Sequence, residues 1–284
     1  MSKTYNDLYI RTRRAFREAG IKAYDLEARL IMSYASGKPA DKLMRDMLFY
    51  TSGEIAEKVE KLISRRLKGE PVAYITGSWE FYGMPLEITP AVLIPRIDTE
   101  LLAKAAIELM QTNTGARILD LCAGSGCVGC AISRELPGAR IVMADKDREA
   151  LKICRRNVVL NDLNPVVSCV EADAKADPPM MMGSFDLIVS NPPYIPTTDI
   201  LTLDASVRDF EPIEALNGGP DGLDFFRAIL AHWKQIVRDG GYMMFEIGVN
   251  QAEDVRKLMR LAGIKNIMSA IDTLGIERVV WGKV

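Results

Sequence analysis

Histidine is almost absent from this sequence, with one residue among 284. That residue, His232, falls in a predicted helix over residues 222–238, away from both motifs described below. We interpret it as a surface or packing residue, so the chemistry should not depend on a histidine base.

Long apolar runs are absent as well. No stretch approaches the roughly 18 consecutive apolar residues that a membrane span needs, and residues 1–6 do not look like the start of a signal peptide. We therefore expect a cytoplasmic protein without membrane contact.

Cysteine is scarce and odd in number, with five residues that lie in or beside apolar segments. This usage fits a reducing compartment better than a disulfide framework. Cys127 and Cys130 have the spacing of a zinc-ligand pair, but they fall at a predicted helix start without a second pair. We interpret them as small buried side chains and expect no metal site.

The formal charge of −2 makes the whole chain a poor non-specific binder of nucleic acid. Residues 1–78 carry 15 Lys/Arg against 10 Asp/Glu, and the remainder carries 21 against 28. The basic excess at the amino-terminal end either meets an acidic partner or is simply solvated. The length favours one large domain plus a smaller one.

Two patterns divide the chain. Apolar residues spaced by three and four predict helices over residues 5–19, 24–36, 41–48 and 52–68, which indicates a small helical domain over residues 1–74. Aromatic and β-branched residues around Gly83 predict a β-hairpin linker over residues 75–90.

Helices and strands alternate through the third part, residues 91–284. This alternation predicts an α/β domain with a mostly parallel sheet, and with ligands at the carboxyl ends of the strands. We expect helices at 98–111, 127–136, 147–160, 222–238 and 250–261, and strands at 116–121, 140–145, 166–171, 185–190, 241–247, 266–271 and 276–282.

A glycine-rich loop follows the first of these strands. Gly124, Gly126 and Gly129 let the backbone turn sharply and approach a ligand where a helix begins, and their spacing also satisfies the dinucleotide fingerprint. Asp120, just before the loop, would repel a pyrophosphate but attract the ammonium of a cationic cofactor. S-adenosylmethionine has that charge pattern, whereas NAD does not.

Two further aspartates end neighbouring strands. Asp145 is placed to accept both ribose hydroxyls of a nucleoside, a role that fits NAD equally. Asp173 follows the third strand and would reach the adenine end. Either residue has the alternative role of a capping or turn residue.

Ser190-Asn191-Pro192-Pro193-Tyr194 follows the apolar strand 185–190. The two prolines lack backbone N–H groups and hold the chain extended, so carbonyls gather there without donors. With the Asn191 side-chain carbonyl and the Tyr194 ring, the segment suits a planar NH2 group. A bare Pro-Pro would otherwise be only a loop.

A methyl donor gives this acceptor site a purpose. Two hydrogen bonds, to Asn191 Oδ1 and the Pro192 carbonyl, would aim the nitrogen at a methyl carbon and stabilise the developing positive charge. Proton loss can follow methyl transfer.

The loop from Asp120 to Gly126, Asp145 and residues 191–194, in this order, resemble class I methyltransferases that act on planar nitrogens. Flanking segments are similar to the HemK/PrmC family of glutamine methyltransferases. They are residues 71–77, 81–83, 95–100, 211–212, 215–216 and 218–223.

The resemblance implies a Rossmann-like domain with a mostly parallel seven-stranded sheet, and a helical domain that docks the substrate. It implies methyl transfer from S-adenosyl-L-methionine, which leaves S-adenosyl-L-homocysteine, to the glutamine side-chain amide in the Gly-Gly-Gln motif of peptide chain release factors. We expect a monomer with no nucleic-acid substrate.

Residue roles follow from the same resemblance. Asn191, Pro192 and Tyr194 would be catalytic, and the substrate would contact Asn191, Pro192, Pro193 and Tyr194. The cofactor would contact Cys122, Ala123, Gly124, Ser125, Gly126, Asp145, Ala174 and Asn191. Charge and position, as described above, add Asp120 and Asp173 to this set.

Two positions depart from the family pattern. Cys122 stands where the family usually has glycine, which implies a bulkier loop start. Ala174 stands where it often has an aromatic residue, so backbone contacts or Met180–Met182 would have to cover the adenine. Arg96, Asp98 and Glu100 either cap the helix after them or shape the site.

Two other functions stay open at this point. Adenine or cytosine offers the same NH2 group, so an amino-methyltransferase of nucleic acid is one rival. It predicts a basic groove and a base-reading segment, whereas the large domain is net acidic and has no long insertion. A non-catalytic nucleotide-binding module is the other rival.

Overall fold

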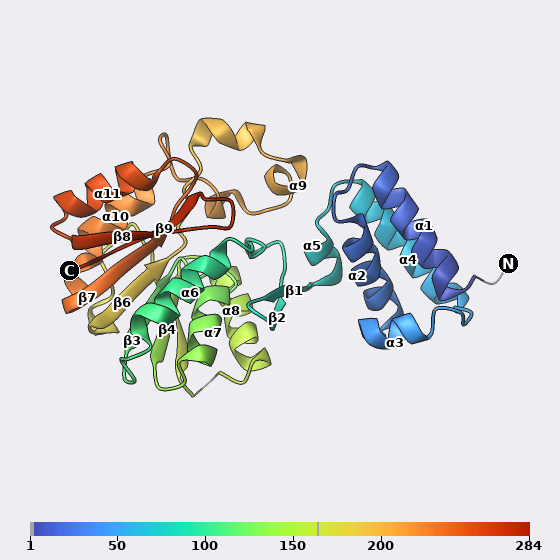
Figure 1. The fold of residues 1–284 in the computed structure, drawn as a ribbon, viewed down its shortest axis with the longest axis horizontal. Helices are drawn as coiled ribbons and strands as arrows, with labels where there is room; N and C mark the ends of the chain where they lie inside the picture. Colours follow the sequence, from blue (N-terminus) through green and yellow to red (C-terminus); the bar gives the residue numbers. More distant parts are fainter. Residues whose placement is uncertain (1–2, 164) are drawn as a thin grey trace. The chain divides into compact units, whose positions relative to one another are not determined.

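The structure, a computed structural model, describes residues 3–163 and 165–284 (Figure 1). It divides into two compact units. One is Met1–Ser78 with Asp204–Phe210, and the other is Trp79–Leu203 with Glu211–Val284. Among the described residues, no helix is long and apolar enough to cross a membrane.

The first unit is helical. Its helices are α1 (Tyr5–Glu18), α2 (Tyr24–Ser36), α3 (Ala40–Arg45), α4 (Gly53–Leu67), α5 (Val72–Thr76) and the short α9 (Ala205–Arg208). Thr4 starts α1 with a capping box, in which its hydroxyl accepts from Asp7 N at 3.1 Å and the Asp7 carboxylate accepts from Thr4 N at 2.8 Å. Leu8 and Phe16 are fully buried, so α1 packs through one apolar face on α2 and α4.

The prediction of a hairpin from residue 75 is wrong at its start. Pro71 precedes α5, which ends at Gly77 with a φ of 69°. Val72, Ala73 and Ile75 are buried, so burial of an apolar turn of helix overrides their β-propensity. The hairpin itself is shorter, with β1 (Ser78–Phe81) and β2 (Met84–Glu87) joined by Tyr82 and Gly83, both at positive φ.

The second unit contains a seven-stranded sheet in the order β5-β4-β3-β6-β7-β9-β8. β9 is antiparallel to both of its neighbours, and the other pairs are parallel. The strands are β3 (Arg117–Leu121), β4 (Arg140–Asp145), β5 (Val167–Glu171), β6 (Phe185–Ser190), β7 (Val237–Glu246), β8 (Lys265–Ile271) and β9 (Glu277–Lys283).

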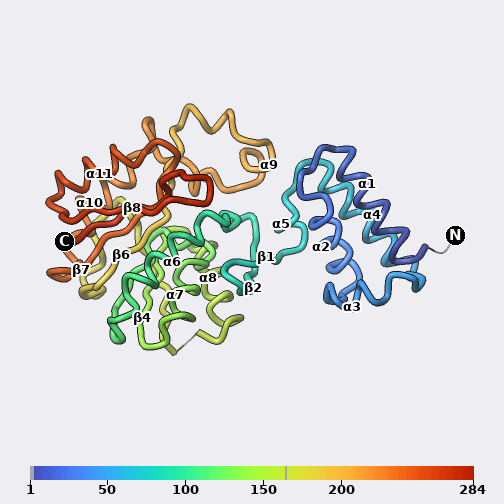
Figure 2. The backbone as a smooth tube through the Cα atoms, viewed as in Figure 1, coloured from blue at the N-terminus to red at the C-terminus, as the bar shows by residue number. Residues whose placement is uncertain are grey.

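Helices cover both faces of this sheet. α6 (Thr99–Met110), α7 (Cys127–Glu135) and α8 (Arg148–Leu160) lie on one face, and α10 (Asp224–His232) and α11 (Ala252–Leu261) on the other (Figures 1 and 2). Single turns of 3₁₀ helix are η1 (Met180–Met182), η3 (Ile213–Ala215) and η4 (Lys234–Ile236), and η2 (Thr197–Thr202) is longer.

The predicted helix over residues 222–238 is also wrong at its end. α10 stops at His232, and Val237 already pairs with Phe185 in the sheet. Trp233, fully buried, donates its indole N–H to the Ala174 carbonyl at 3.1 Å and fixes the exit from the helix. The predicted helix 41–48 ends early, at Arg45. The predicted strand 241–247 begins four residues earlier than expected, at Val237, and the remaining predicted helices and strands are confirmed within two residues.

The strand order indicates where a ligand would bind. From the central β3 the chain continues outward to β4 and β5, and then returns to β6 on the other side of β3. Loops at the carboxyl ends of β3 and β6 therefore leave in opposite directions and open a crevice between them. The glycine-rich loop follows β3, and Asn191 follows β6.

Candidate active site

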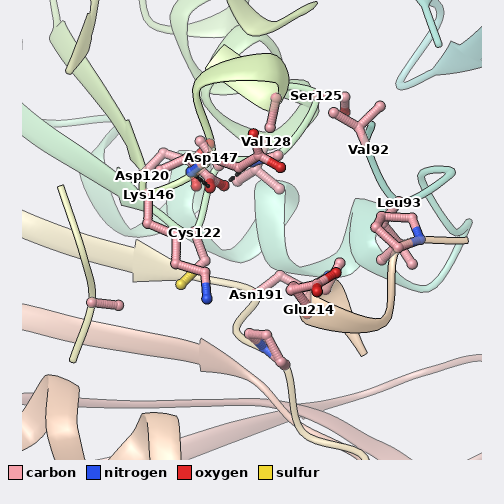
Figure 3. A pocket seen from close by; sticks show the side chains of 18 of the residues that line it. Val92, Leu93, Asp120, Cys122, Ser125, Val128, Lys146, Asp147, Asn191 and Glu214 are labelled. Carbon is pink, nitrogen blue, oxygen red and sulfur yellow. Dashed lines mark hydrogen bonds between the residues drawn. The ribbon is translucent and has the colours of Figure 1, made fainter. Parts of the chain in front are cut away.

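A cleft lies at this edge of the sheet, with about 950 Å³ of empty space that is open to solvent. Figure 3 shows Asp120, Cys122 and Asn191 among the side chains around it. Of the predicted site residues, its lining includes Asp120, Cys122, Ala123, Gly124, Ser125, Asp145, Asp173, Ala174, Asn191 and Pro193. Gly126, Pro192 and Tyr194 are not among the lining residues.

The glycine loop brings the start of α7 close to the sheet. Gly126 has a φ of 79°, and a Cβ there would lie 2.8 Å from Cys154 Sγ. A Cβ on Gly129 would lie 2.6 Å from Met143 Cε. Close packing therefore explains why positions 126 and 129 are glycine. Gly124, at a φ of 54°, lines the cleft instead.

Asp120 lies on β3 beneath the loop and is 2 % exposed. Its Oδ2 accepts a hydrogen bond from Gly129 N at 2.9 Å. Burial raises the pKa of its carboxyl to about 7, and this single hydrogen bond opposes the shift. A cationic ligand beside this buried carboxyl would stabilise its ionised form.

Asp145 ends β4 and holds two backbone segments. Its Oδ2 accepts from Gly124 N at 2.8 Å and its Oδ1 from Asp147 N at 2.9 Å. Each oxygen keeps a further lone pair for a ligand hydroxyl. Asp145 thus acts as a turn residue and also lines the cleft.

Part of the cleft wall is apolar. Ala172, Ala174 and Phe225 line it, and Phe225 comes from α10. Asp173 lines the cleft too, and it also accepts from Lys175 N at 2.8 Å as a turn residue does. The prediction did not include Phe225, for which the only sequence signal was its position just after residues 218–223.

Met180–Met182 do not take the place of a missing aromatic at Ala174. The side chains of Met180 and Met181 are fully exposed, while Met182 is buried in the core. None of the three lines the cleft among the described residues. Phe225 is the aromatic ring in the cleft lining that the structure describes.

The Asn191–Tyr194 segment is held from both sides. Ser190 donates to the Leu121 carbonyl at 2.5 Å, and Gln251 Nε2 donates to the Tyr194 carbonyl at 2.9 Å. A Cβ on Gly218 would lie 2.7 Å from Tyr194 Cα. The segment is thus enclosed, and the Pro192 carbonyl receives no hydrogen bond from the part of the chain that the structure describes.

Two side chains of this segment meet buried partners. Asn191 Nδ2 donates to Thr99 Oγ1 at 3.4 Å, and the Tyr194 hydroxyl donates to Glu246 Oε1 at 3.4 Å. Burial and the nearby Glu246 raise the pKa of Tyr194 well above its usual value. The Tyr194 hydroxyl therefore stays protonated, and the side chain offers an aromatic face and a hydrogen-bond donor.

Asp98 is the N-cap residue of α6, but none of Arg96, Asp98 and Glu100 caps the helix through a side-chain hydrogen bond. Arg96 pairs with the buried Glu211 at 2.5 Å, and the Glu100 carboxylate accepts from Tyr82 N at 2.8 Å. Asp98 makes no capping bond and instead pairs with Arg278 at 3.3 Å. These partners hold the start of α6 and the segment before it in place.

Three candidates from the sequence remain, namely Cys127, Cys130 and His232. Cys130 is fully buried in α7, and Cys127 is buried against the cleft. The described residues contain no group of three or more potential metal ligands. His232 ends α10, where its Nδ1 lies 2.7 Å from Asp177 Oδ1.

Known proteins match this chain along most of its length. Residues 7–77 match the PrmC N-terminal domain, and residues 97–203 match the methyltransferase small domain. A release factor glutamine methyltransferase of Geobacter sulfurreducens is 36% identical over 96% of this chain and 94% of its own. One from Aliivibrio fischeri is 32% identical over 100% of this chain and 98% of its own. The chain belongs to the release factor glutamine methyltransferase family. The resemblance to HemK/PrmC proteins is thereby confirmed.

Solved structures agree on the fold. The hMettl16 catalytic domain in complex with a MAT2A 3′UTR hairpin superposes with a TM-score of 0.57 over 88% of this chain and 90% of that one, at 15% identity. A methyltransferase from Pyrococcus furiosus gives 0.51 over 78% and 96%, at 16% identity. These likenesses show the fold alone, and they confirm the class I methyltransferase architecture.

Cys122 carries the strain of its position. Its φ is 64°, a conformation that suits glycine. We expect Cys122→Gly to leave the free energy of unfolding within about 1 kcal/mol of the parent, because relief of strain offsets lost packing and added chain entropy. Cys130→Gly, in the helical interior of α7, should cost at least ~2 kcal/mol.

Urea denaturation of both variants measures this difference. An equal loss of stability in the two would contradict the assignment of strain to Cys122.

Proposed function

We propose that this protein transfers a methyl group from S-adenosylmethionine to the side-chain amide nitrogen of the glutamine in the Gly-Gly-Gln motif of peptide chain release factors. The observation that carries the proposal is that Asn191 and Asp120 line the same cleft. Asn191 belongs to an acceptor site for a planar NH2 group, and Asp120 stands at the glycine loop.

The charges of the cleft fit such a cofactor. Asp120, Asp145 and Asp173 line it, with Lys146 as a basic neighbour. This lining favours a cation over the pyrophosphate of a dinucleotide. Asp120 and the loop from Cys122 to Ser125 would hold the amino-acid part, Asp145 the ribose, and Ala174 with Phe225 the adenine.

When bound, S-adenosylmethionine supplies an electrophilic methyl group on a sulfonium sulfur. The chain's own contribution is to hold the nucleophile. Asn191 Oδ1 and the Pro192 carbonyl would each accept one N–H of the glutamine amide, and Tyr194 offers the apolar face of its ring. Charge that develops on the nitrogen would then meet fixed oxygen dipoles.

The helical unit would dock the release factor. This role is supported by the match of residues 7–77 to the PrmC N-terminal domain and by the basic excess of residues 1–78. We propose a monomer that meets its substrate in the cytoplasm, where translation terminates.

Methylation of a purified release factor tests the function directly. With S-adenosylmethionine we expect one added methyl group, mapped by mass spectrometry to the glutamine of Gly-Gly-Gln. A release factor with asparagine in place of that glutamine is the matched control and should stay unmodified. Incorporation into nucleic acid and none into the release factor would overturn the proposal.

Removal of the Asn191 amide should be costly. Asn191→Ala should raise the activation free energy by at least ~2 kcal/mol, because one preorganised acceptor is lost. Single-turnover methylation measures the effect. Asn113→Ala, at an exposed turn, is the control and should keep the parent rate. Near-normal turnover in Asn191→Ala would contradict the proposed acceptor site.

Asp120 predicts a pH dependence of cofactor binding. With its pKa raised to about 7, the carboxyl is partly protonated near neutrality. A cationic ligand favours the ionised form, so binding should release a proton below about pH 7 and the affinity should rise with pH until ionisation is complete.

Calorimetry in buffers of different ionisation enthalpy measures both quantities. Because the cofactor's amino group also titrates, Asp120→Asn is the matched comparison and should bind more weakly with less proton release. Equal proton release by the two proteins would remove Asp120 from this role.

A further inference from the structure

Two thiols of the second unit lie in contact next to the glycine-rich loop. Cys154 comes from α8 and Cys169 from β5, and their sulfur atoms are 3.4 Å apart. Both cysteines are free in the structure. The two sulfurs of a disulfide are about 2.0 Å apart, so a sulfur shift of about 1.4 Å would join this pair.

The two thiols differ in exposure and in acidity. Cys154 is fully buried, whereas Cys169 is partly exposed on β5, an edge strand of the sheet. The hydrogen bond with Cys154 lowers the pKa of the Cys169 thiol, and the Arg155 guanidinium adds to this effect, while burial opposes it. The same hydrogen bond and burial raise the pKa of Cys154. Cys169 is therefore the nucleophile that an oxidant in solution meets, and Cys154 stands behind it as a second thiol.

Cys154 also packs against the glycine-rich loop. A Cβ on Gly126 would lie 2.8 Å from Cys154 Sγ and 3.1 Å from Met143 Sδ, so these two sulfurs fill the space beside the loop. Three residues further along α8, Asn157 Nδ2 donates to the Ser125 carbonyl at 2.9 Å. Since Ser125 lines the cleft, α8 supports the loop from behind at two points.

We propose that Cys154 and Cys169 are a redox-sensitive pair, which a peroxide joins as a disulfide, and that this disulfide weakens the support that α8 gives to the glycine-rich loop. The bond would draw the Cys154 sulfur toward β5 and away from Gly126. Disulfides in reducing compartments are usually transient and redox-sensing, which suits a pair that a dithiol can separate again. The consequence for cofactor binding rests on the proposed function, whereas the bond and the change in the loop do not.

The oxidation has two steps. The Cys169 thiolate attacks one oxygen of hydrogen peroxide and the O–O bond breaks, which gives a sulfenic acid and a hydroxide that takes up the proton released by the thiol. The Cys154 sulfur then attacks the Cys169 sulfur, the S–O bond breaks, and the Cys154 proton leaves with the hydroxyl group as water. The thiols lose two electrons and two protons, and the peroxide becomes two water molecules. Thiol–disulfide exchange with dithiothreitol reverses the change.

Mass spectrometry tests the bond itself. With equimolar hydrogen peroxide the parent should lose two hydrogen atoms, a peptide map should join Cys154 to Cys169, and dithiothreitol should restore the parent mass. Cys154→Ala should instead leave a sulfenic acid on Cys169 that a cyclic dione captures. Cys130→Ala is the matched control, because Cys130 is equally buried but lies in α7, and it should form the same disulfide. Oxidation of Cys169 to a sulfinic acid without any bond to Cys154 would overturn the proposal.

Hydrogen exchange measures the support of the loop without any ligand. Gly126 N donates to the Ala123 carbonyl at 2.8 Å, and Cys130 N donates to the Gly126 carbonyl at 2.9 Å. The disulfide should speed exchange of these two amides about fivefold or more, whereas peroxide should leave their exchange unchanged in Cys169→Ala. Equal exchange in the reduced and oxidised parent would disprove the link between the pair and the loop.

S-adenosylhomocysteine is the probe for the cofactor site. Its Kd should be about fivefold or more higher for the oxidised parent than for the reduced one. By linkage, saturation with the probe should favour the dithiol by the same factor in a glutathione redox buffer. Cys169→Ala should bind equally with and without peroxide. Equal Kd values for the two forms of the parent would refute the effect on the site. If neither form binds the probe, the proposed function fails, and the mass and exchange results still decide the redox pair.

Discussion

The parallel register of β3 against β6 is the constraint on which the site depends. Leu121 pairs with Ser190, and the Ser190 hydroxyl reinforces the pairing through its 2.5 Å bond to the Leu121 carbonyl. The residues that follow are Cys122 and Asn191, so this register brings the glycine-rich loop and the proposed acceptor site to the same level. A slip of one residue would reverse the side-chain directions and separate the two.

Buried acids at this edge are stabilised in different ways, and the differences correspond to their roles. Glu211 has a full partner in Arg96 and contributes to structure. Asp120 accepts from one backbone N–H and Glu246 from the Tyr194 hydroxyl, and burial raises the pKa of both carboxyls to about 7. Incomplete compensation leaves these two carboxyls responsive to a ligand or a proton, which a fully paired carboxylate would not be.

Local patterns predicted what depends on local sequence. The glycine loop, Asp145 and the Asn191–Tyr194 segment each follow a short apolar strand, so alternation of helix and strand was enough to bring them to one edge. Phe225 and Glu246 could not be found this way. Phe225 lies in an amphipathic helix and Glu246 ends an apolar strand, and only the three-dimensional packing shows which residues they meet. Trp233 illustrates the same limit, because its long-range bond to Ala174 ends a helix that the apolar spacing would have continued.

The acceptor site alone does not choose its substrate, because a glutamine amide and a nucleobase amine both present two coplanar N–H groups. We propose that charge distinguishes the two substrates. Residues 79–284 carry 21 Lys/Arg against 28 Asp/Glu, and Asp145 and Asp173 line the cleft itself. A nucleic-acid strand would bring phosphates into this field without the counterion release that basic grooves provide. A glutamine on a polypeptide brings a neutral amide, so the same carboxylates that favour a cationic cofactor also favour a protein substrate.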